Sequence, residues 1–564
     1  MDGDGNYQFK IVPYGGTTMG TAVETEITDY QAPLAQAELT AAGSKSKVEL
    51  SWNAVEGASS YDVYRKLGSD GEAVLVKTTA ENAFTDTDVV EEEPYYYYVI
   101  AKNDKNTSNP SATMQVLTSD GHTGAYVYEN EATKLTVAYK SNDTVFDDNA
   151  LLVLTADEAG TAQLYVNDVL ADTKTVGAGD EMKFEPKLKK GRNDVTVIFT
   201  DAEGNATRKT FNFVANPDVD IVVDAAYTGE DGAESDGLPV YKTVQAAVNA
   251  VPEDNAEAKV IYIKNGEYNE RVEVKSPYVS LLGQDSEKTH LFYSVCVANG
   301  NADSMWNRNA MYVDTAATGF TAENLTVENS YDYTNGSDQQ ADALCIVADQ
   351  TACINVRLIG YQDTLLTDTR TKDENGNYAV TRQYFNKCYI TGNVDFIYGA
   401  GTSVFEDCDI VARYTEYKSD GCYTAGRTYA STPYGYVFNN CRFLAEEGVA
   451  DGAYRMARPW GADDSTTFMN CYLGRAISLE TSYGDMSGNL AENARFAEYG
   501  SYGPGYTVNN KRPYLTSAQA AKFKTDTVMG DYDYSARTAT LYGTQQEKPK
   551  TDITVVDKAE VVKN

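Results

Sequence analysis

The sequence predicts an all-β protein in which two β-sandwich modules precede a right-handed parallel β-helix. The 564 residues include 43 Tyr but only 14 Pro, and few stretches have the apolar period of a long helix. Alternating apolar segments, separated by turn-forming residues, fill the first part of the chain. From residue 218 onward a short strand motif recurs at intervals of 20 to 33 residues, which is typical of a solenoid.

The N-terminal part of the chain is expected to form sandwich modules. Residues 35–118 contain alternating strands around Trp52, a pattern that resembles a fibronectin type III domain. Residues 119–217 resemble a bacterial immunoglobulin-like module. Residues 1–34 repeat the end of the fibronectin-like pattern, so we interpret them as the C-terminal strands of a truncated module, frayed or docked on its neighbour. We expect both complete modules to act as spacers.

The recurring motif defines the third region, residues 218–540. An apolar or aromatic residue is followed by Asn, Asp or Lys, then by a Cys, Leu or Val anchor, a variable residue and another apolar residue. The anchors are Leu325, Val356, Cys388, Cys408, Cys441 and Cys471. β-Branched and Cys-rich strands favour a parallel β-helix over a leucine-rich horseshoe. Residues 541–564 are rich in Lys, Glu and Thr and are expected to form a tail or linker.

Four of the eight cysteines occupy one equivalent inward position in successive repeats. Cys is a common small buried residue, so this spacing favours structural burial over disulfides or a catalytic thiol. Cys345 and Cys353 are expected only to be buried. The sequence holds no Cys-x-x-Cys pair, which argues against a zinc ribbon.

Composition and charge exclude several classes of function. The net charge of −36 argues against nucleic-acid binding and against docking to anionic membranes, and no segment is apolar enough to insert into a bilayer. With only His122 and His290, a Ser-His-Asp triad or a multi-His metal site is nearly excluded. We expect neither metal nor cofactor, so hydrolysis would have to use carboxylates or Cys. The first residues do not resemble a signal peptide, and we interpret Met1 as a start placed inside a longer protein.

The repeat register brings two carboxylates together. Asp363 lies seven residues after Val356 and Asp395 lies seven after Cys388, so stacked repeats would place them one turn apart. Adjacent strands are about 4.8 Å apart. Two like charges at such a spacing raise one pKa and give one acid and one anion, the arrangement for a nucleophile with a general acid/base. Asp332 has the same offset from its own anchor, but its longer polar loop is expected to lose the register.

At these residues the chain resembles the pectin methylesterases, the pectinesterase family of carbohydrate esterases, over roughly residues 218–540. Five motifs match in order: Gly266-Glu-Tyr-Asn-Glu270, Gln340-Ala-Asp-Ala-Leu344, Gln362-Asp-Thr-Leu365, Val394-Asp-Phe-Ile-Tyr-Gly399 and Arg458-Pro-Trp460. The resemblance implies a β-helix enzyme that hydrolyses the C6 methyl esters of galacturonan to pectate and methanol.

The resemblance also implies a role for each candidate catalytic residue. Asp395 would be the nucleophile that attacks the ester carbonyl carbon, and Asp363 would protonate the departing methanol and then activate water. Gln340 and Gln362 would donate hydrogen bonds to the oxyanion, a task that suits neutral donors because they do not first pair with the carboxylates. Arg458 would keep Asp395 ionised and oriented through a charge-assisted fork.

Four aromatic residues are expected to contact the substrate. Trp460 would offer an apolar face to the sugar, and Phe396 and Tyr398 follow the nucleophile in the chain. Tyr398 stands where the family usually has Phe, and Tyr483 stands where a substrate-stacking Trp is usual. The resemblance thus implies pectin or homogalacturonan as the partner, and we expect the protein to act as a monomer. A polymer substrate and fibronectin-like spacers indicate a secreted or surface-attached bacterial protein.

Two alternative functions stay open at the level of sequence. A pectate lyase or polygalacturonase could share the β-helix and the polymer, since a fold does not fix a reaction. A lyase would need a calcium-binding acidic cluster and a basic proton acceptor. A non-catalytic carbohydrate-binding scaffold is the other alternative, and the complete set of candidate catalytic residues argues against it.

Overall fold

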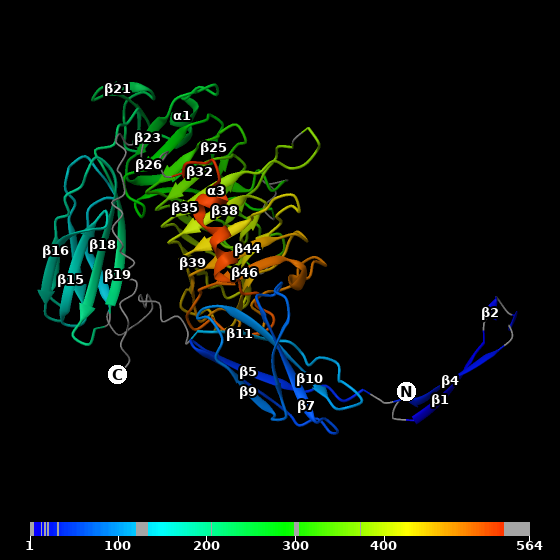
Figure 1. Cartoon of the computed structure of the whole chain (residues 1–564). Coiled ribbons are helices and arrows are strands. Elements are labelled where there is room, and N and C mark those ends of the chain that lie inside the picture. Colours follow the sequence, from blue (N-terminus) through cyan, green and yellow to red (C-terminus); the bar gives the residue numbers. More distant parts are fainter. Residues whose placement is uncertain are drawn as a thin grey trace. The chain divides into compact units, whose positions relative to one another are not determined.

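The computed structural model describes residues 5–12, 14–15, 18–19, 22–30, 33–119, 134–204, 206–297, 304–334, 336–372 and 374–534. The chain divides into two compact units. Figure 1 colours the chain along its sequence, from blue at the N-terminus to red near the C-terminus. One unit comprises Met1–Gly121 with Thr507–Gln519, and the other comprises His122–Tyr506 with Ala520–Asn564. The expected tail at residues 541–564 and His122 lie outside the described residues.

The first unit contains a two-sheet sandwich. One sheet has the order β5-β6-β9 and the other has the order β11-β10-β7-β8. The bounds are β5 (Leu39–Ser44), β6 (Lys47–Trp52), β7 (Ser60–Leu67), β8 (Val74–Thr79), β9 (Ala83–Asp86), β10 (Pro94–Lys102) and β11 (Met114–Leu117). Alternating side chains of β6 and β10 face inward, and they include Trp52, Tyr97 and Val99. The fibronectin type III assignment stays a prediction.

Two further parts belong to this unit. Two antiparallel pairs precede the sandwich: β1 (Gly5–Ile11) with β4 (Val23–Tyr30), and β2 (Tyr14–Gly15) with β3 (Thr18–Met19). Residues 507–519, which the sequence places in the β-helix region, are grouped with the sandwich instead. The side chain of Asn510 accepts from the backbone N–H of Gln115 at 2.9 Å, and Ser517 bonds to Glu93. Long-range side-chain contacts of this kind leave no periodic signal in the sequence.

The second unit begins with another sandwich, within residues 134–215. Its sheets have the orders β12-β14-β17 and β13-β19-β18-β15-β16. The bounds are β12 (Leu135–Lys140), β13 (Thr144–Val145), β14 (Leu152–Ala156), β15 (Gly160–Val166), β16 (Val169–Val176), β17 (Glu181–Phe184), β18 (Gly191–Asp201) and β19 (Ala206–Ala215). Phe184, Phe199 and Phe213 are fully buried between the sheets. The immunoglobulin-like assignment stays a prediction.

Three stacked sheets form the rest of this unit, and successive turns contribute strands to each. Sheet 1 consists of β21 (Ala233–Ser235), β22 (Leu238–Tyr241), β20 (Ile221–Val223), β23 (Lys259–Ile263), β26 (Val279–Gly283), β29 (Thr321–Glu323), β32 (Thr351–Ile354), β35 (Arg382–Asn386), β38 (Thr402–Glu406), β41 (Tyr436–Asn439), β44 (Ser465–Met469) and β46 (Arg495–Tyr499). Sheet 2 consists of β24 (Gly266–Asn269), β27 (Thr289–Tyr293), β30 (Thr326–Asn329), β33 (Arg357–Ile359), β36 (Tyr389–Gly392), β39 (Asp409–Ala412), β42 (Arg442–Ala445) and β45 (Tyr472–Leu473). Sheet 3 consists of β25 (Val272–Val274), β28 (Asn309–Val313), β31 (Asp342–Ile346), β34 (Leu365–Thr367), β37 (Val394–Gly399), β40 (Gly421–Gly426) and β43 (Tyr454–Ala457).

Within these sheets neighbouring strands run parallel, apart from β21 against β22. The predicted parallel β-helix is therefore confirmed. The residue before each anchor adopts a left-handed conformation, with φ between 50° and 57°, and so bends the chain from sheet 1 into sheet 2. These residues are Asn324, Asn355, Lys387, Asp407, Asn440 and Asn470. Asn and Asp tolerate this conformation best, which explains why the motif favours them there.

The interior of the β-helix is built from like residues stacked on successive turns. Phe385, Phe405, Phe438 and Phe468 stack with centroid separations of 4.6, 4.6 and 5.4 Å. All eight cysteines are buried and none forms a disulfide, which confirms the predicted burial of the repeat cysteines, Cys345 and Cys353. Inward stacking of this kind holds the turns in register and thereby fixes where the residues after each strand end lie.

Short helices occur near the start and near the end of the β-helix sequence. α1 (Val244–Asn249) begins after Thr243, whose side chain accepts from the N–H of Ala246. Near the C-terminal end lie η1 (Ala491–Asn493), α2 (Ser517–Ala520), η2 (Ala521–Phe523) and α3 (Thr525–Met529), with α2 crossing from one unit to the other. In the part of the chain that the structure describes, every helix is too short or too polar to cross a membrane.

Candidate active site

The two candidate aspartates lie on neighbouring turns, between sheets 2 and 3. Strands β34 and β37 pair Leu365 with Ile397, and the same register continued by two residues pairs Asp363 with Asp395. The N–H of Asp363 donates to the carbonyl of Val394 at 3.0 Å. The stacking expected from the repeat is thereby confirmed. Both aspartates have a left-handed backbone, with φ of 67° and 49°, at the bend where each turn enters sheet 3.

Asp395 is held by a two-point fork from Arg458. The guanidinium Nε donates to Oδ1 at 2.6 Å and Nη2 donates to Oδ2 at 2.5 Å. Asp395 is only 5% exposed, and burial raises its pKa while the Arg458 fork opposes that rise. Arg458 follows strand β43, and its N–H donates to the carbonyl of Thr424 at 3.1 Å. The fork matches both carboxylate oxygens and so fixes the orientation of Asp395.

Asp363 has a different partner, which the sequence did not indicate. Arg308 donates from Nη2 to Asp363 Oδ2 at 2.7 Å and to the hydroxyl of Tyr398 at 2.8 Å. The same guanidinium forms an ion pair with Asp342, its Nε lying 3.5 Å from Oδ2. Tyr398 donates in turn to Asp342 Oδ1 at 2.7 Å. Arg308 therefore serves two carboxylates, where Arg458 serves one.

The surroundings of Asp363 oppose its ionisation. Burial raises its pKa well above the usual range, the charges of Asp342 and Asp395 raise it further, and Arg308 and Arg458 act in the opposite direction. Asp342 is fully buried, and burial raises its pKa to about 7 against the attraction of Arg308. Burial raises the pKa of both stacked aspartates, and they differ in how their guanidinium partners oppose that rise.

The candidate oxyanion donors lie on the turns next to the carboxylates. Ala341 N–H donates to the carbonyl of Gln362 at 3.1 Å, which ties the residue after Gln340 to the turn that carries Asp363. Both glutamine side chains are half-buried. The Oε1 atom of Gln340 is buried and, within the described part of the chain, accepts no hydrogen bond. The backbone bond from Ala341 thus places Gln340 on the turn next to the one that carries Asp363.

The four candidate substrate contacts have different environments. Trp460 is half-buried, with its ring 5.9 Å from that of Tyr398 and Arg427 over its face at 4.3 Å. Tyr398 is only 4% exposed and its hydroxyl is held in the Arg308–Asp342 network. Phe396 is fully buried in the β-helix core. Neither Phe396 nor Tyr398 therefore exposes a ring surface to a sugar.

A bulge explains the burial of these two rings. Between the pairs Val394–Cys422 and Ile397–Thr424, strand β37 holds one residue more than β40. The extra residue shifts the inward and outward alternation, so Phe396 faces the core while Tyr398 faces the polar network.

Tyr483, the fourth candidate, stacks on Phe496 at 4.9 Å and donates to Glu498 at 2.8 Å, so its ring is held by core contacts. Trp306, whose ring lies under Arg370 at 5.2 Å, joins Trp460 in the apolar cluster beside the site.

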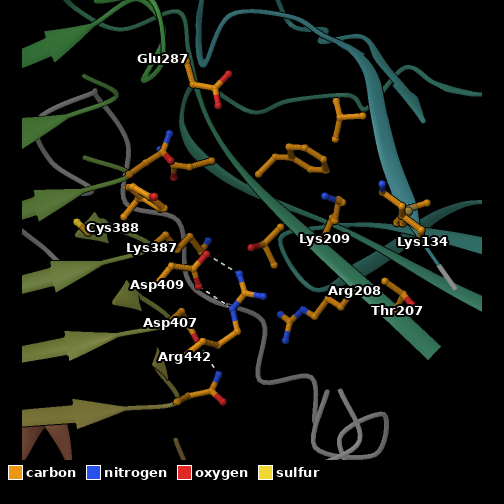
Figure 2. Close-up of a pocket in the computed structure, with 18 of the residues that line it drawn as sticks. Lys134, Thr207, Arg208, Lys209, Glu287, Lys387, Cys388, Asp407, Asp409 and Arg442 are labelled. Carbon is orange, nitrogen blue, oxygen red and sulfur yellow. Dashed lines mark hydrogen bonds and ion pairs between the residues drawn. The ribbon is translucent and has the colours of Figure 1, made fainter. Parts of the chain in front are cut away.

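A separate pocket of about 1110 Å³ lies between β19 and sheet 2, away from every candidate residue (Figure 2). Side chains of both charges line it. Arg442 forks Asp409 there, with Nε to Oδ1 at 2.6 Å and Nη2 to Oδ2 at 2.5 Å. The cations of this pocket are thus largely matched by neighbouring acids. Among the described residues, His, Cys, Asp and Glu side chains form no group of three that could hold a metal ion.

Comparisons with known proteins place this geometry in a family. The pectinesterase family model matches residues 233–530, more than half of the chain. The chain belongs to the pectinesterase family. It is therefore a carboxylic-ester hydrolase, and its reaction is the hydrolysis of pectin methyl esters.

Two relatives similar in sequence agree with this assignment, and one solved structure is also similar to the chain. Pectinesterase A of Dickeya dadantii is 33% identical over 342 residues, covering 53% of this chain and 89% of that protein. A pectinesterase of Petunia integrifolia is 29% identical over 290 residues, covering 49% and 71% of the two chains. A solved structure of a carrot pectin methylesterase aligns with a TM-score of 0.48 and 27% identity, over 57% of this chain and 96% of that one.

Proposed function

We propose that the family's reaction runs here on Asp395 as nucleophile and Asp363 as general acid and then base. The observation that carries this assignment is the unequal pairing of two stacked aspartates. Of the two aspartates, only Asp395 has a guanidinium that contacts both of its oxygens. This contact favours the anion required for attack. Asp363 shares its guanidinium and has its pKa raised, which favours the protonated form required of an acid.

In the first half of the reaction an oxygen of Asp395 attacks the C6 carbonyl carbon of a methyl-esterified galacturonate. The carbonyl oxygen becomes an oxyanion, which the amide N–H groups of Gln340 and Gln362 stabilise. The C–O bond to the methoxy group then breaks as Asp363 gives that oxygen its proton. Methanol leaves, and the sugar acyl group stays bonded to Asp395 as an anhydride.

The second half reverses the proton transfer. Asp363, now a carboxylate, takes a proton from a water molecule as the water oxygen attacks the anhydride carbonyl carbon. The bond between the acyl carbon and Asp395 breaks, which releases a free galacturonate and restores the Asp395 anion beside Arg458. Asp363 holds the proton again, so the site returns to its first state.

The substrate of this site is proposed to be the polysaccharide homogalacturonan. Trp460, half-buried beside the carboxylates, supplies the apolar face on which a sugar ring packs. Because pectin is a polymer outside cells, we infer that the protein acts extracellularly. We also propose that it acts as a monomer and that the two sandwich modules are spacers.

Methanol release from highly methylated pectin tests the assignment. Asp395→Ala should abolish release. Among the described residues, the remaining carboxylate next to Asp363 is Asp342, which shares Arg308 and has no guanidinium of its own. Asp409→Ala is a matched control, since Asp409 has the same fork geometry from Arg442 on a different face of the β-helix. Wild-type methanol release by Asp395→Ala would refute the nucleophile. Unsaturated or reducing ends in place of methanol would favour a lyase or polygalacturonase instead.

A further inference from the structure

A third carboxylate continues the line of the two candidate catalytic aspartates. Strands β31 and β34 pair Leu344 with Leu365, and the same register pairs Asp342 with Asp363. Asp342, Asp363 and Asp395 thus lie on three successive turns, and they are 0%, 7% and 5% exposed. Water cannot screen three charges that are buried to this degree, so protein groups must balance them.

The described cations do not balance all three carboxylates. Arg458 is fully engaged by Asp395, and Arg308 is the guanidinium that both Asp342 and Asp363 contact. Two guanidinium charges face three carboxylates, so one negative charge is left over unless a proton is bound. Asp342 Oδ2 is buried and, among the described residues, receives no hydrogen bond, so Arg308 meets it only through the 3.5 Å ion pair from Nε. One proton bound within the Asp342–Asp363 pair removes the excess.

We propose that Asp342 is a positioning residue that keeps Asp363 protonated in the resting enzyme, acting through their shared Arg308. The inference rests on the proposed roles of Asp395 and Asp363. Two contacts decide which member of the pair is the anion. Asp342 accepts from the Tyr398 hydroxyl and faces Arg308, so its negative charge is stabilised deep in the site. Asp363 lies nearer to the nucleophile, where a second negative charge is opposed by Asp395.

This arrangement would keep available the proton that Asp363 gives to the departing methoxy oxygen. A general acid works only while it is protonated, and an ordinary Asp is ionised well below neutral pH. In its ionised form, which prevails above its pKa of about 7, Asp342 extends the pH range over which Asp363 holds its proton. Tyr398 is a second positioning residue in this scheme, because its hydroxyl stabilises the Asp342 anion.

Other groups facing these carboxylates are few and do not change the sign of the effect. Asp363 also faces Tyr333 and Tyr398, Asp342 also faces Cys345, and Asp395 also faces Lys418 and Cys422. The tyrosines and cysteines are neutral at neutral pH, and burial raises the pKa of Tyr333, Tyr398 and Cys345 further. Lys418 acts on Asp395, the member that is already paired.

The pH dependence of kcat/KM for methanol release tests the proposal. Asp342→Asn keeps the shape and the acceptor oxygen but removes the charge, and it leaves Arg308 to Asp363 alone. The pKa of Asp363 should fall, so the alkaline limb of the profile should move by about 1 to 2 units toward acid pH. The rate at the acid optimum should stay within a few-fold of wild type. An alkaline limb that stays in place, or moves toward alkaline pH, would overturn the inference.

Two further variants make the result independent of folding defects. Tyr398→Phe removes one hydroxyl, destabilises the Asp342 anion and should move the limb in the same direction by a smaller amount. Asp464→Asn is the matched control: Asp464 is equally buried, burial raises its pKa to about 7 as well, and it has no contact with Arg308. This control should leave the limb in place, and a limb that moves with Asp464→Asn would show a general effect of removing buried charge.

Infrared difference spectroscopy supplies a readout that a purely structural role would not change. At a pH just below the wild-type alkaline limb, the wild type should show a protonated carboxyl that disappears in both Asp363→Asn and Asp342→Asn. Persistence of that carboxyl in Asp342→Asn would contradict the proposal. Failure of the proposed function is recognised separately: it would appear as methanol release by Asp395→Ala, whatever the profile of Asp342→Asn.

Discussion

Asp395 and Asp363 lie on neighbouring turns of one β-helix, with similar burial and the same left-handed backbone, yet their cationic partners differ. Asp395 receives two charge-assisted bonds from Arg458, and among the described residues Arg458 forms an ion pair with this carboxylate alone. Asp363 receives one bond from Arg308, which also serves Asp342 and Tyr398. Burial and position alone therefore do not assign the roles. The share of a guanidinium that each carboxylate obtains separates the proposed anion from the proposed acid.

The largest expected effect separates the two roles by leaving group. Asp395→Asn should lower kcat/KM by about 10⁴ or more for any ester, because the nucleophile is lost. Asp363→Asn should cost about 10²- to 10⁴-fold on the methyl ester, the range of a lost general acid. With a trifluoroethyl ester of the same oligogalacturonan, the leaving alcohol needs no proton, so Asp363→Asn should recover most of its loss.

The burst of alcohol in the first turnover is the quantity to measure for both esters. The burst reports formation of the acyl-enzyme before Asp363 is needed again as a base. If the trifluoroethyl ester rescued Asp395→Asn and not Asp363→Asn, the two assignments would have to be exchanged.

The next effect concerns the space between the two carboxylates, where the oxyanion would form. Gln340→Ala should lower kcat by about 100- to 1000-fold with little change in KM, because its amide bonds to charge that exists only in the transition state. Gln383→Ala is a suitable control, since Gln383 is fully buried in the same β-helix and donates to the carbonyl of Ala348. A loss in Gln340→Ala that appears only in KM would indicate substrate binding instead.

A smaller effect tests the fork itself. Arg458→Lys keeps the charge but replaces two matched bonds by one point contact. The loss of one charge-assisted bond, about 1.5 to 3 kcal/mol, corresponds to roughly 10- to 150-fold in kcat/KM. Arg442→Lys breaks a fork of the same geometry around Asp409 and should leave methanol release unchanged. Equal losses in the two variants would mean that forks matter here for folding alone.

The β-helix and the stacked aspartates could be predicted because both follow from one repeat. Each anchor fixes a strand, each left-handed residue before it fixes a bend, and a constant offset then places Asp363 and Asp395 together. The partners of Asp363 follow no such rule. Arg308 lies in a polar turn with no anchor, 55 positions away from the residue it contacts. Asp342 lies inside a matching motif, but nothing in the sequence says which residue it faces.

The aromatic residues show a second limit of the pattern. The positions of Phe396 and Tyr398 beside the nucleophile suggest sugar contacts, yet both are buried. A single extra residue in strand β37 changes which way each side chain points, and one bulge leaves no mark in a short motif. Alternation predicts faces only while the strand is regular.

The smallest effect turns the comparison into a difference in stability. The pKa of Asp363 is raised above its unfolded value, so the folded protein binds more protons than the unfolded chain between those two pKa values. Folding stability is therefore lost as pH rises through this window, and Asp363→Asn, which is neutral throughout, should avoid that loss. The melting temperature of Asp363→Asn should exceed that of wild type by a few degrees at alkaline pH and match it at acid pH.

Asp395→Asn should instead melt lower than wild type, because Arg458 keeps its buried charge without a counter-ion. Scanning calorimetry across pH measures both, and a fall of equal size in the two variants would show that the two carboxylates are held alike after all.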